Sequence, residues 1–525
     1  MNNIFRNKKT WVIAAVVIIV AVFIILLAGR QDSDFSEKYA GFDLSGASTG
    51  RANIYIRYME QHANTPAATQ DISIDIFNWT SADGVSTLEN FENEMRVLRT
   101  EEISSVEYTV NIREAGLYFM QLEYFPLPSR GIAMERSLYI NGEVPFIGAD
   151  RLSFQRVWGN DGNSRFDNQG NEIRPRQIEL PRWESAFFRD SLGYIVEPYT
   201  FYLHEGQNTL RLVGMNEPLA FRSLTLTAPQ KTPTYREYLA GFDLNQFANS
   251  RRTYSLKIQG ERADRRSDSS LYGIYDRSSG ATDPASVASI RLNMIGGEAW
   301  RIAGQWIEWD FDVPENGLYR ITIKGRQNYN RGFVSNRTIM INGQVICQEL
   351  AAVPFAYTNK WKHYTLADAQ GDILVPLERG MNSLRMQVTL GELGDMLNTM
   401  EESVFRLNAI YRKILVLTGP EPDVFRDYRV EEVYPDVMVA MELESKILYK
   451  LVDDLTRYSG ERSAEAAVAL TIARQLEYLN ISARHNTHCV MRWPSYTQVD
   501  GSGHCAWSHT LRGSQRGSRY VKPTF

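Results

Sequence analysis

The chain has 525 residues, of which 43% are hydrophobic and 23% charged, and its formal net charge at pH 7 is −5. This composition, with a mean hydropathy of −0.33, excludes a polytopic membrane protein and a wholly disordered chain. At roughly 100–200 residues per domain, the length predicts about three folded units. The mild acidity argues against nucleic acid as the main partner, because proteins that bind phosphate backbones concentrate positive charge. Three cysteines cannot form a disulfide framework.

The amino end carries one continuous apolar run, residues 11–28, with the sequence WVIAAVVIIVAVFIILLA. At 1.5 Å per residue this makes about 27 Å of helix, enough to cross a hydrocarbon core of ~30 Å. Arg6, Lys8 and Lys9 precede the run, so the positive-inside rule places residues 1–10 in the cytoplasm. A cleaved signal peptide is the alternative, although its apolar core usually has about 7–15 residues. We therefore predict a single-pass anchor in the cell membrane, with the bulk of the chain extracytoplasmic.

An internal repeat organises the middle of the chain. Ala40–Leu44 recurs as Ala240–Leu244, and residues 106–146 align without a gap on residues 307–347. Both copies carry an alternating apolar run, Gly-Leu-Tyr, a second alternating run and Ile-Asn-Gly. Alternation places one face of a strand in a core, and Asn-Gly is a favoured two-residue hairpin turn.

The repeat predicts a mainly β fold with two antiparallel, jelly-roll-like β-sandwiches, over residues 39–229 and 235–391. Ala228–Pro233 is the expected linker between them. The rival interpretation is a single large sandwich with duplicated strands, in which the two copies would pair within one sheet.

After Leu390 the apolar period becomes that of a helix, which predicts a helical segment over residues 392–478 with a bundle-like core. The remaining residues, 479–525, carry six Lys/Arg against one acid and show no period. We predict that this tail is disordered and out of frame, with a genuine basic tail as the alternative. Its metal-ligand side chains lack the pair spacing of a zinc motif; they are His485, His488, Cys489, His504 and Cys505.

The strand pattern, the Ile-Asn-Gly hairpins and the Gly-x-Asn-x-Leu-Arg stretches at Gly206–Arg211 and Gly380–Arg385 resemble galactose-binding-like β-sandwiches, which occur as carbohydrate-binding modules. Over residues 5–478 the chain resembles the amino-terminal half of large extracellular solute-binding proteins of Gram-positive carbohydrate ABC transporters. The stretches that carry this likeness are Tyr39–Leu44, Arg51–His62, Gly170–Pro175, Pro181–Ala186, Gly325–Gly332, Tyr411–Thr418 and Leu448–Asp454. In that family a two-lobed solute-binding domain follows, and this sequence shows no counterpart of it. An ABC permease is therefore a partner implied by kinship alone.

Sugar binding needs aromatic faces for stacking and Asn, Asp or Arg side chains for hydroxyl groups. In the first predicted sandwich Trp158 and Trp183 flank a polar loop. In the second, two clusters combine these residue types: Tyr272, Tyr275, Asp276 and Arg277, and then Asn328, Tyr329, Asn330 and Arg331. We predict that these ten residues contact a saccharide, with core packing as the alternative for each aromatic.

Residues 161–172 have the length of an EF-hand calcium loop, but Arg165 and Phe166 stand at positions that need a ligand and a glycine. The EF-hand interpretation therefore fails. A looser structural calcium site remains an alternative to an ordinary polar loop, and no other cofactor is predicted.

No catalytic motif occurs: there is no Gly-x-Ser-x-Gly, no His-Glu-x-x-His and no phosphate loop. We therefore predict that the chain is not an enzyme, although a glycosidase carboxylate pair is defined only in space. The expected function is a membrane-anchored, extracellular, carbohydrate-directed binding protein. The alternatives are a structural or docking module without sugar binding, and an ancillary part of a polysaccharide-degrading enzyme.

Overall fold

The computed structural model describes residues 54–92, 95–242, 254–420, 423, 426 and 428–484. The chain divides into two units, Met1–Arg57 and Tyr58–Phe525, and the second holds the elements below, apart from the start of the short helix α3 (Tyr55–Gln61). None of the described helices is long and apolar enough to cross a membrane. The predicted anchor at residues 11–28 and the cytoplasmic stub lie outside the described residues.

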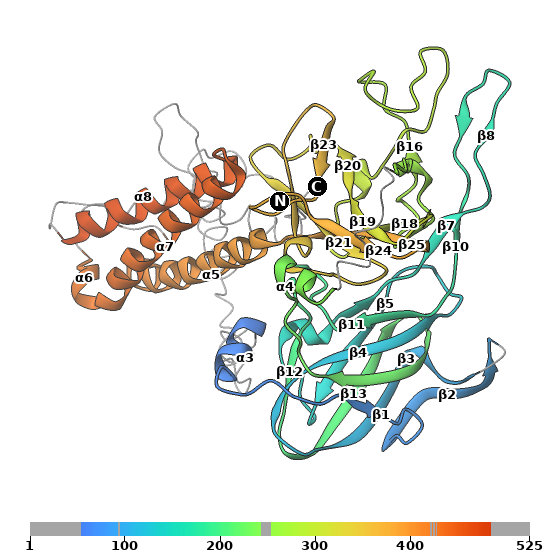
Figure 1. Ribbon diagram of the computed structural model, residues 1–525. Coiled ribbons are helices and arrows are strands. Elements are labelled where there is room, and N and C mark those ends of the chain that lie inside the picture. Colours follow the sequence, from blue (N-terminus) through green and yellow to red (C-terminus); the bar gives the residue numbers. More distant parts are fainter. Residues whose placement is uncertain are drawn as a thin grey trace, which may run out of the picture. The chain divides into compact units, whose positions relative to one another are not determined.

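The first sandwich is built from one antiparallel, ten-stranded sheet that folds over itself in the described part of the chain (Figure 1). Its central order is β11-β4-β14-β3-β13-β5-β6, with β1, β12 and β2 attached to β14, β4 and β3. The strands are β1 (Ile72–Ile74), β2 (Ser81–Phe91), β3 (Met95–Ile112), β4 (Gly116–Pro126), β5 (Met134–Ile140), β6 (Leu152–Phe154), β11 (Glu184–Phe187), β12 (Thr200–Leu203), β13 (Gly206–Asn216) and β14 (Leu219–Thr227).

Strand β14 joins the two layers of this sandwich. Its first residues pair with β3, and its whole length pairs with β4, with a shift of register at Arg222. Leu224 and Leu226 stand opposite Leu122 and Met120, and all four side chains are buried. The alternation seen in the sequence thus places one face of β4 and β14 in the core.

The second sandwich has a seven-stranded sheet in the order β10-β7-β15-β18-β25-β21-β22, opposed by short strand pairs. Its strands are β7 (Trp158–Asn160), β10 (Gln177–Glu179), β15 (Arg265–Arg266), β18 (Trp306–Val313), β21 (Val334–Ile341), β22 (Val353–Ala356) and β25 (Gly380–Thr389). The short pairs are β19 (Gly317–Arg320) with β24 (Leu374–Leu377), β20 (Thr322–Gly325) with β23 (Lys362–Thr365), β16 (Gly273–Ile274) with β17 (Met294–Ile295), and β8 (Arg165–Phe166) with β9 (Glu172–Ile173).

The two copies of the repeat lie in different sheets: β3, β4 and β5 carry the first, whereas β18 to β21 carry the second. The pairing expected for a single duplicated sandwich does not occur. Both predicted hairpin turns have the backbone that Asn-Gly favours, with φ of 52° and 87° at Asn141 and Gly142 and of 50° and 80° at Asn342 and Gly343. Two antiparallel sandwich-like sheets, as the repeat predicted, are what the structure contains.

The division between the sandwiches differs from the predicted one. Strands β7 and β10 belong to the first predicted range, residues 39–229, yet they extend the sheet of the second sandwich. Buried Arg266 of β15 holds them there, because its guanidinium donates to Asn160 Oδ1 at 2.9 Å and to Gln177 Oε1 at 2.6 Å. Strands of three residues are too short to show an alternating pattern, so their membership in the second sheet could not be predicted from the sequence.

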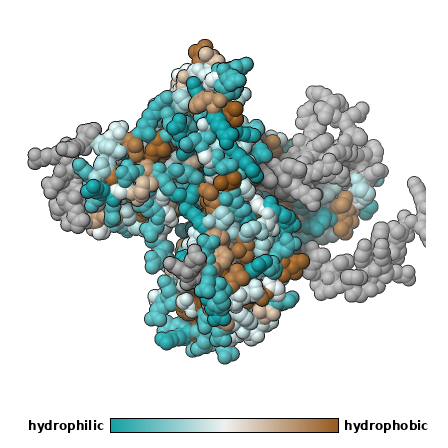
Figure 2. All heavy atoms as spheres, turned by 90° about the vertical axis from the view of Figure 1, so that its right-hand side faces the viewer, coloured by the Kyte–Doolittle hydropathy of each residue, from teal (hydrophilic) through white to brown (hydrophobic). Residues whose placement is uncertain are grey.

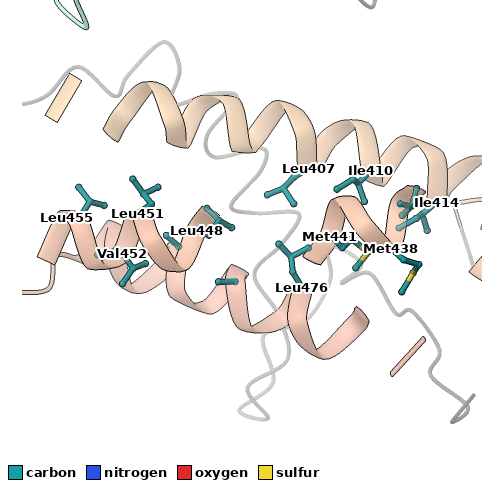
Figure 3. Packing of buried hydrophobic residues seen from close by; sticks show 14 of the residues in the cluster. Leu407, Ile410, Ile414, Met438, Met441, Leu448, Leu451, Val452, Leu455 and Leu476 are labelled. Carbon is teal, nitrogen blue, oxygen red and sulfur yellow. The ribbon is translucent and has the colours of Figure 1, made fainter. Parts of the chain in front are cut away.

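The predicted helical segment is confirmed. It contains α5 (Glu392–Thr418), α6 (Val430–Val433), α7 (Pro435–Ser459) and α8 (Ala464–Arg484), and the short helix α4 (Tyr235–Ala240) precedes the second sandwich. Figure 3 shows how α5, α7 and α8 pack through buried side chains such as Leu407, Met441 and Leu476. Helix α8 continues to Arg484, so the first residues of the tail predicted as disordered are helical; residues 485–525 lie outside the described part.

Hydrophobic residues on the face drawn in Figure 2 form small groups separated by hydrophilic ones. This is the ordinary surface of a folded domain, on which scattered apolar side chains need no special explanation. The described residues of this face therefore give no sign of a large apolar docking surface.

Candidate functional site: a cleft in the second sandwich

The second sandwich encloses a cleft of about 760 Å³, within the range of roughly 300–1,000 Å³ that is typical of ligand sites. It has two regions. The strand end is lined by Tyr254–Ile258, by β19 and β20, and by inward side chains of β18 and β25. The loop end is lined by Glu261, Trp300, Arg326, Asn328, Tyr329, Arg337 and Trp361.

Asp276 does not line the cleft itself, but it contacts two side chains that line the loop end. Trp361 Nε1 donates to Asp276 Oδ2 at 3.0 Å, and Arg326 Nη2 lies 3.1 Å from the same oxygen. The backbone N–H of Ser278 donates to the other carboxylate oxygen, Oδ1, at 2.8 Å. Burial tends to raise the pKa of Asp276, but the hydrogen bonds from Ser278 and Trp361 and the charge of Arg326 outweigh it and hold the pKa below its ordinary value. The carboxylate therefore fixes two lining side chains in place.

Glu261 lines the loop end with a carboxylate oxygen that accepts no hydrogen bond from the described residues. Its side chain is buried, with 6% of the residue exposed, and Oε1 has no hydrogen-bond partner among the described residues. Burial raises the pKa of this carboxyl. An unpartnered buried acceptor is costly, and the usual reason for its presence is a ligand or water that completes its bonding.

Aromatic rings surround these groups. Tyr329 is 44% exposed, and no hydrogen bond or ring contact joins it to another described residue. Trp300 donates its indole N–H to the Gln305 carbonyl at 3.3 Å, and the Arg337 guanidinium lies 4.3 Å from its ring centroid. Burial lowers the pKa of Arg337 to about 9. The loop end thus combines one exposed ring with polar groups held at fixed positions.

The structure separates the predicted site residues. Asn328 and Tyr329 line the cleft, and Asp276 supports it. Tyr272 lies under the Arg174 guanidinium at 4.0 Å, while Tyr275 and Arg277 are exposed and do not line the cleft. Of the two predicted clusters in the second sandwich, Asn328 and Tyr329 thus line the loop end, and Asp276 contacts side chains that line it.

Asn330 and Arg331 serve other contacts. The Asn330 backbone exchanges hydrogen bonds with the Gln327 side chain. Arg331 pairs with Glu461 at 3.7 Å, and a Cβ on neighbouring Gly332 would lie 2.8 Å from the Ser463 Cα. This end of the loop therefore meets the helical segment.

The two tryptophans assigned to the first sandwich do not line the cleft. Trp183 packs edge-on against Phe91 and Phe125, and the Arg222 guanidinium lies 4.6 Å from its ring centroid. Trp158 lies in β7, where a Cβ on Gly131 would come within 3.3 Å of its ring. Trp183 is thus held by ring and cation–π contacts, whereas half-buried Trp158 lies beside Gly131 on a strand away from the cleft.

No sequence signal marked four residues of the loop end as site residues: Glu261, Trp300, Arg326 and Trp361. None belongs to a periodic pattern or a motif, and they come from four separate loops and strand ends. Only Arg326 lay in a stretch singled out for the family resemblance. Spatial convergence of this kind leaves no signal in a single sequence.

The proposed calcium loop is the hairpin of β8 and β9. Asp167 Oδ1 accepts from the backbone N–H groups of Gln169 and Asn171, both at 2.8 Å, and Glu172 Oε2 accepts from the Leu292 N–H at 2.9 Å. Among the described residues, no group of three or more His, Cys, Asp or Glu side chains is placed to hold a metal ion. Asp167 and Glu172 thus accept hydrogen bonds from backbone N–H groups of the turn and of a neighbouring segment.

No protein-family model matches the chain, and no curated protein matches it. Among solved structures, it is similar to a family 35 carbohydrate-binding module from Clostridium thermocellum (10% identity, TM-score 0.20, 31% of this chain and 100% of that chain). It is also similar to the CBM6 module of Cellvibrio mixtus lichenase 5A in complex with cellotriose (10%, 0.19, 30% and 98%). A third is the Podospora anserina GH26-CBM35 β-(1,4)-mannanase (12%, 0.19), of which the chain covers 28%.

Proposed function

We propose that the chain is a carbohydrate-binding protein and that the loop end of the cleft takes the sugar. The observation that carries this proposal is that one cleft holds both an exposed ring, Tyr329, and a buried carboxyl, Glu261, whose Oε1 has no hydrogen-bond partner among the described residues. A sugar presents an apolar ring face and several hydroxyl donors. An exposed ring and an unused acceptor match that chemistry.

The fixed geometry of the loop end supports the same proposal. Asp276 holds Trp361 and Arg326 through hydrogen bonds and an ion pair, so little side-chain freedom is lost when a ligand binds. Arg326, with its guanidinium 5.0 Å from the Trp361 ring centroid, keeps further N–H groups for hydroxyl oxygens.

Calorimetric titration of the full-length chain in detergent with plant and bacterial oligosaccharides tests the proposal. We expect Tyr329→Ala to weaken binding about tenfold, since a stacking contact contributes about 0.5–1.5 kcal/mol beyond its buried area. Tyr275→Ala is the matched control, because this tyrosine is also exposed but does not line the cleft. Equal effects of the two variants would place the sugar elsewhere, and a failure of all saccharides to bind would favour a structural or docking module.

We further propose a location and a context for this binding. Residues 11–28 anchor the chain, the sandwiches lie outside the cell membrane, and captured saccharide is passed towards an ABC permease. The apolar run supports the first two points, and the family resemblance supports the third. Protease treatment of intact cells tests the orientation: we expect digestion of residues 54–484, and full protection would contradict it.

A further inference from the structure

The first sandwich contains a long strand, β14, that has no counterpart among the described strands of the second. In the first, β14 follows β13 and pairs with β4 along Leu219–Thr227. In the second, β25 corresponds to β13, but the chain then enters helix α5. Strands β19 and β20 correspond to β4, and within the described residues they pair only with β24 and β23. The edge that β14 covers in the first sandwich therefore has no paired strand in the second among the residues that the structure describes.

The open edge exposes side chains that are buried in the first copy. Met120 and Leu122 of β4 are 1% exposed, and β14 covers them. Their counterparts, Ile321 and Ile323, are half-buried and line the strand end of the cleft. The groove has the position and the apolar lining that a strand such as β14 would fill.

The other side of the strand end has a strand-like sequence without strand pairing. Tyr254, Leu256 and Ile258 alternate with polar residues and are 42%, 46% and 41% exposed. Among the described residues, the backbone of 254–258 forms no hydrogen bond with another backbone group. Two stretches whose backbone groups have no strand partner on this side, within the described part of the chain, thus line the same groove.

We propose that the strand end of the cleft binds an extended polypeptide strand of a partner protein, which pairs with the open edge of β19 and β20. Main-chain hydrogen bonds along the edge would provide affinity, and alternating apolar side chains would fill the groove, as Leu224 and Leu226 do in the first sandwich. A strand is favoured over a saccharide here because the walls are mainly apolar.

The charged side chains that line the strand end indicate which residue types the partner strand has at the positions that face away from the groove. The strand end has three basic side chains, Lys257, Arg320 and Lys324, and one acidic side chain, Asp283. Lys257 is ion-paired with Asp283, and Arg320 Nε lies 2.6 Å from Asp372 Oδ2, whereas no ion pair joins exposed Lys324 to another described residue. An acidic residue on the incoming strand complements the charge of Lys324. The expected partner segment is therefore a strand with alternating apolar residues and acidic outward residues, about as long as β14.

A peptide derived from β14 tests the proposal. The probe is a capped peptide of residues 219–227 carrying Arg222→Glu, Thr225→Glu and Thr227→Glu, titrated into the full-length chain in detergent without sugar. We expect saturable binding, and we expect N-methylation of alternate amides in the peptide to weaken it at least tenfold, since methylated amides cannot pair with an edge. Absence of binding, or equal binding of the methylated peptide, would overturn the proposal.

A matched pair of charge reversals identifies the site. Lys324 and Lys362 are both exposed and lie on the paired strands β20 and β23, but only Lys324 lines the cleft. We expect Lys324→Glu to weaken the acidic peptide severalfold and Lys362→Glu to leave it unchanged. Equal effects would contradict binding at this edge. Because no sugar is present, either result leaves the sugar-binding proposal to its own test.

Discussion

Glu261 connects the stability of the second sandwich to the proposed sugar binding. Its carboxyl is buried, Oε1 lacks a partner among the described residues, and burial raises its pKa above the ordinary value. The folded chain then binds this proton more tightly than the unfolded chain does. The contribution of this group to the free energy of unfolding is therefore greatest below its unfolded-state pKa, and it is lost as pH rises through the folded-state pKa.

We expect Glu261→Gln to be more stable than the parent at pH 7, by on the order of 1 kcal/mol, because the cost of the buried charge disappears. The difference should vanish below about pH 4, where the parent carboxyl is protonated in both states. Sugar binding should weaken about tenfold through the lost charged acceptor. Urea unfolding at several pH values measures the first effect; a pH-independent difference would contradict the argument.

At the scale of single elements, the clearest expectation concerns helix α8. Leu476 is fully buried against α7, and Asn480 Nδ2 donates to the Met438 carbonyl at 2.5 Å. Helix α8 is thus tied to the bundle beyond the point where the sequence pattern lost its register. Packing against a neighbouring helix, which a local pattern does not record, maintains it.

We expect Leu476→Ala to lower the free energy of unfolding by about 2–5 kcal/mol, the usual cost of truncating a buried leucine. Tyr478→Ala, at a 66% exposed position two residues away, should stay within about 0.5 kcal/mol of the parent. Denaturant unfolding followed by circular dichroism compares the two. Similar effects would mean that this end of α8 does not pack as described.

Elements with long, repeated patterns could be predicted, and short ones could not. Strands β3 and β18 have buried counterparts in the two copies, such as Tyr108 and Trp309, so the alternation was visible twice. Strands β7 and β10 have three residues each, and the pairing of Arg266 with Trp158 is fixed only by tertiary contacts. The candidate site was also predictable only in part. Tyr329 could be predicted from its residue type, whereas Glu261 could not, because its significance comes from its burial in the fold.

At the scale of the whole molecule, a buried ion cluster connects strands of the two sandwiches. Glu308 of β18 pairs with Arg385 at 2.5 Å and with Arg265 at 2.6 Å, and Arg385 also lies 3.4 Å from Glu184 of β11. Burial tends to raise the pKa of Glu308, but the two arginines outweigh it and hold the pKa below its ordinary value. The stabilisation is therefore present above the usual carboxyl range and is lost as pH falls through the folded pKa.

We expect Glu308→Gln to cost about 3–5 kcal/mol at neutral pH, because it leaves buried arginine charges without a full partner. The difference from the parent should shrink in acid. Glu89→Gln is the control, since the Glu89–Arg96 pair is exposed and surface pairs contribute about 0–1 kcal/mol. Calorimetric unfolding across pH gives both values, and a small neutral-pH effect of Glu308→Gln would show that the cluster is not a structural link.

A glycan array probed in parallel with the parent and with Tyr329→Ala tests whether the loop end of the cleft binds sugar. We expect the full-length parent to bind a related set of saccharides, and the variant to lose most of that signal while keeping its unfolding temperature. A parent that binds no glycan, or a variant that retains the same glycans at the same strength, would contradict it.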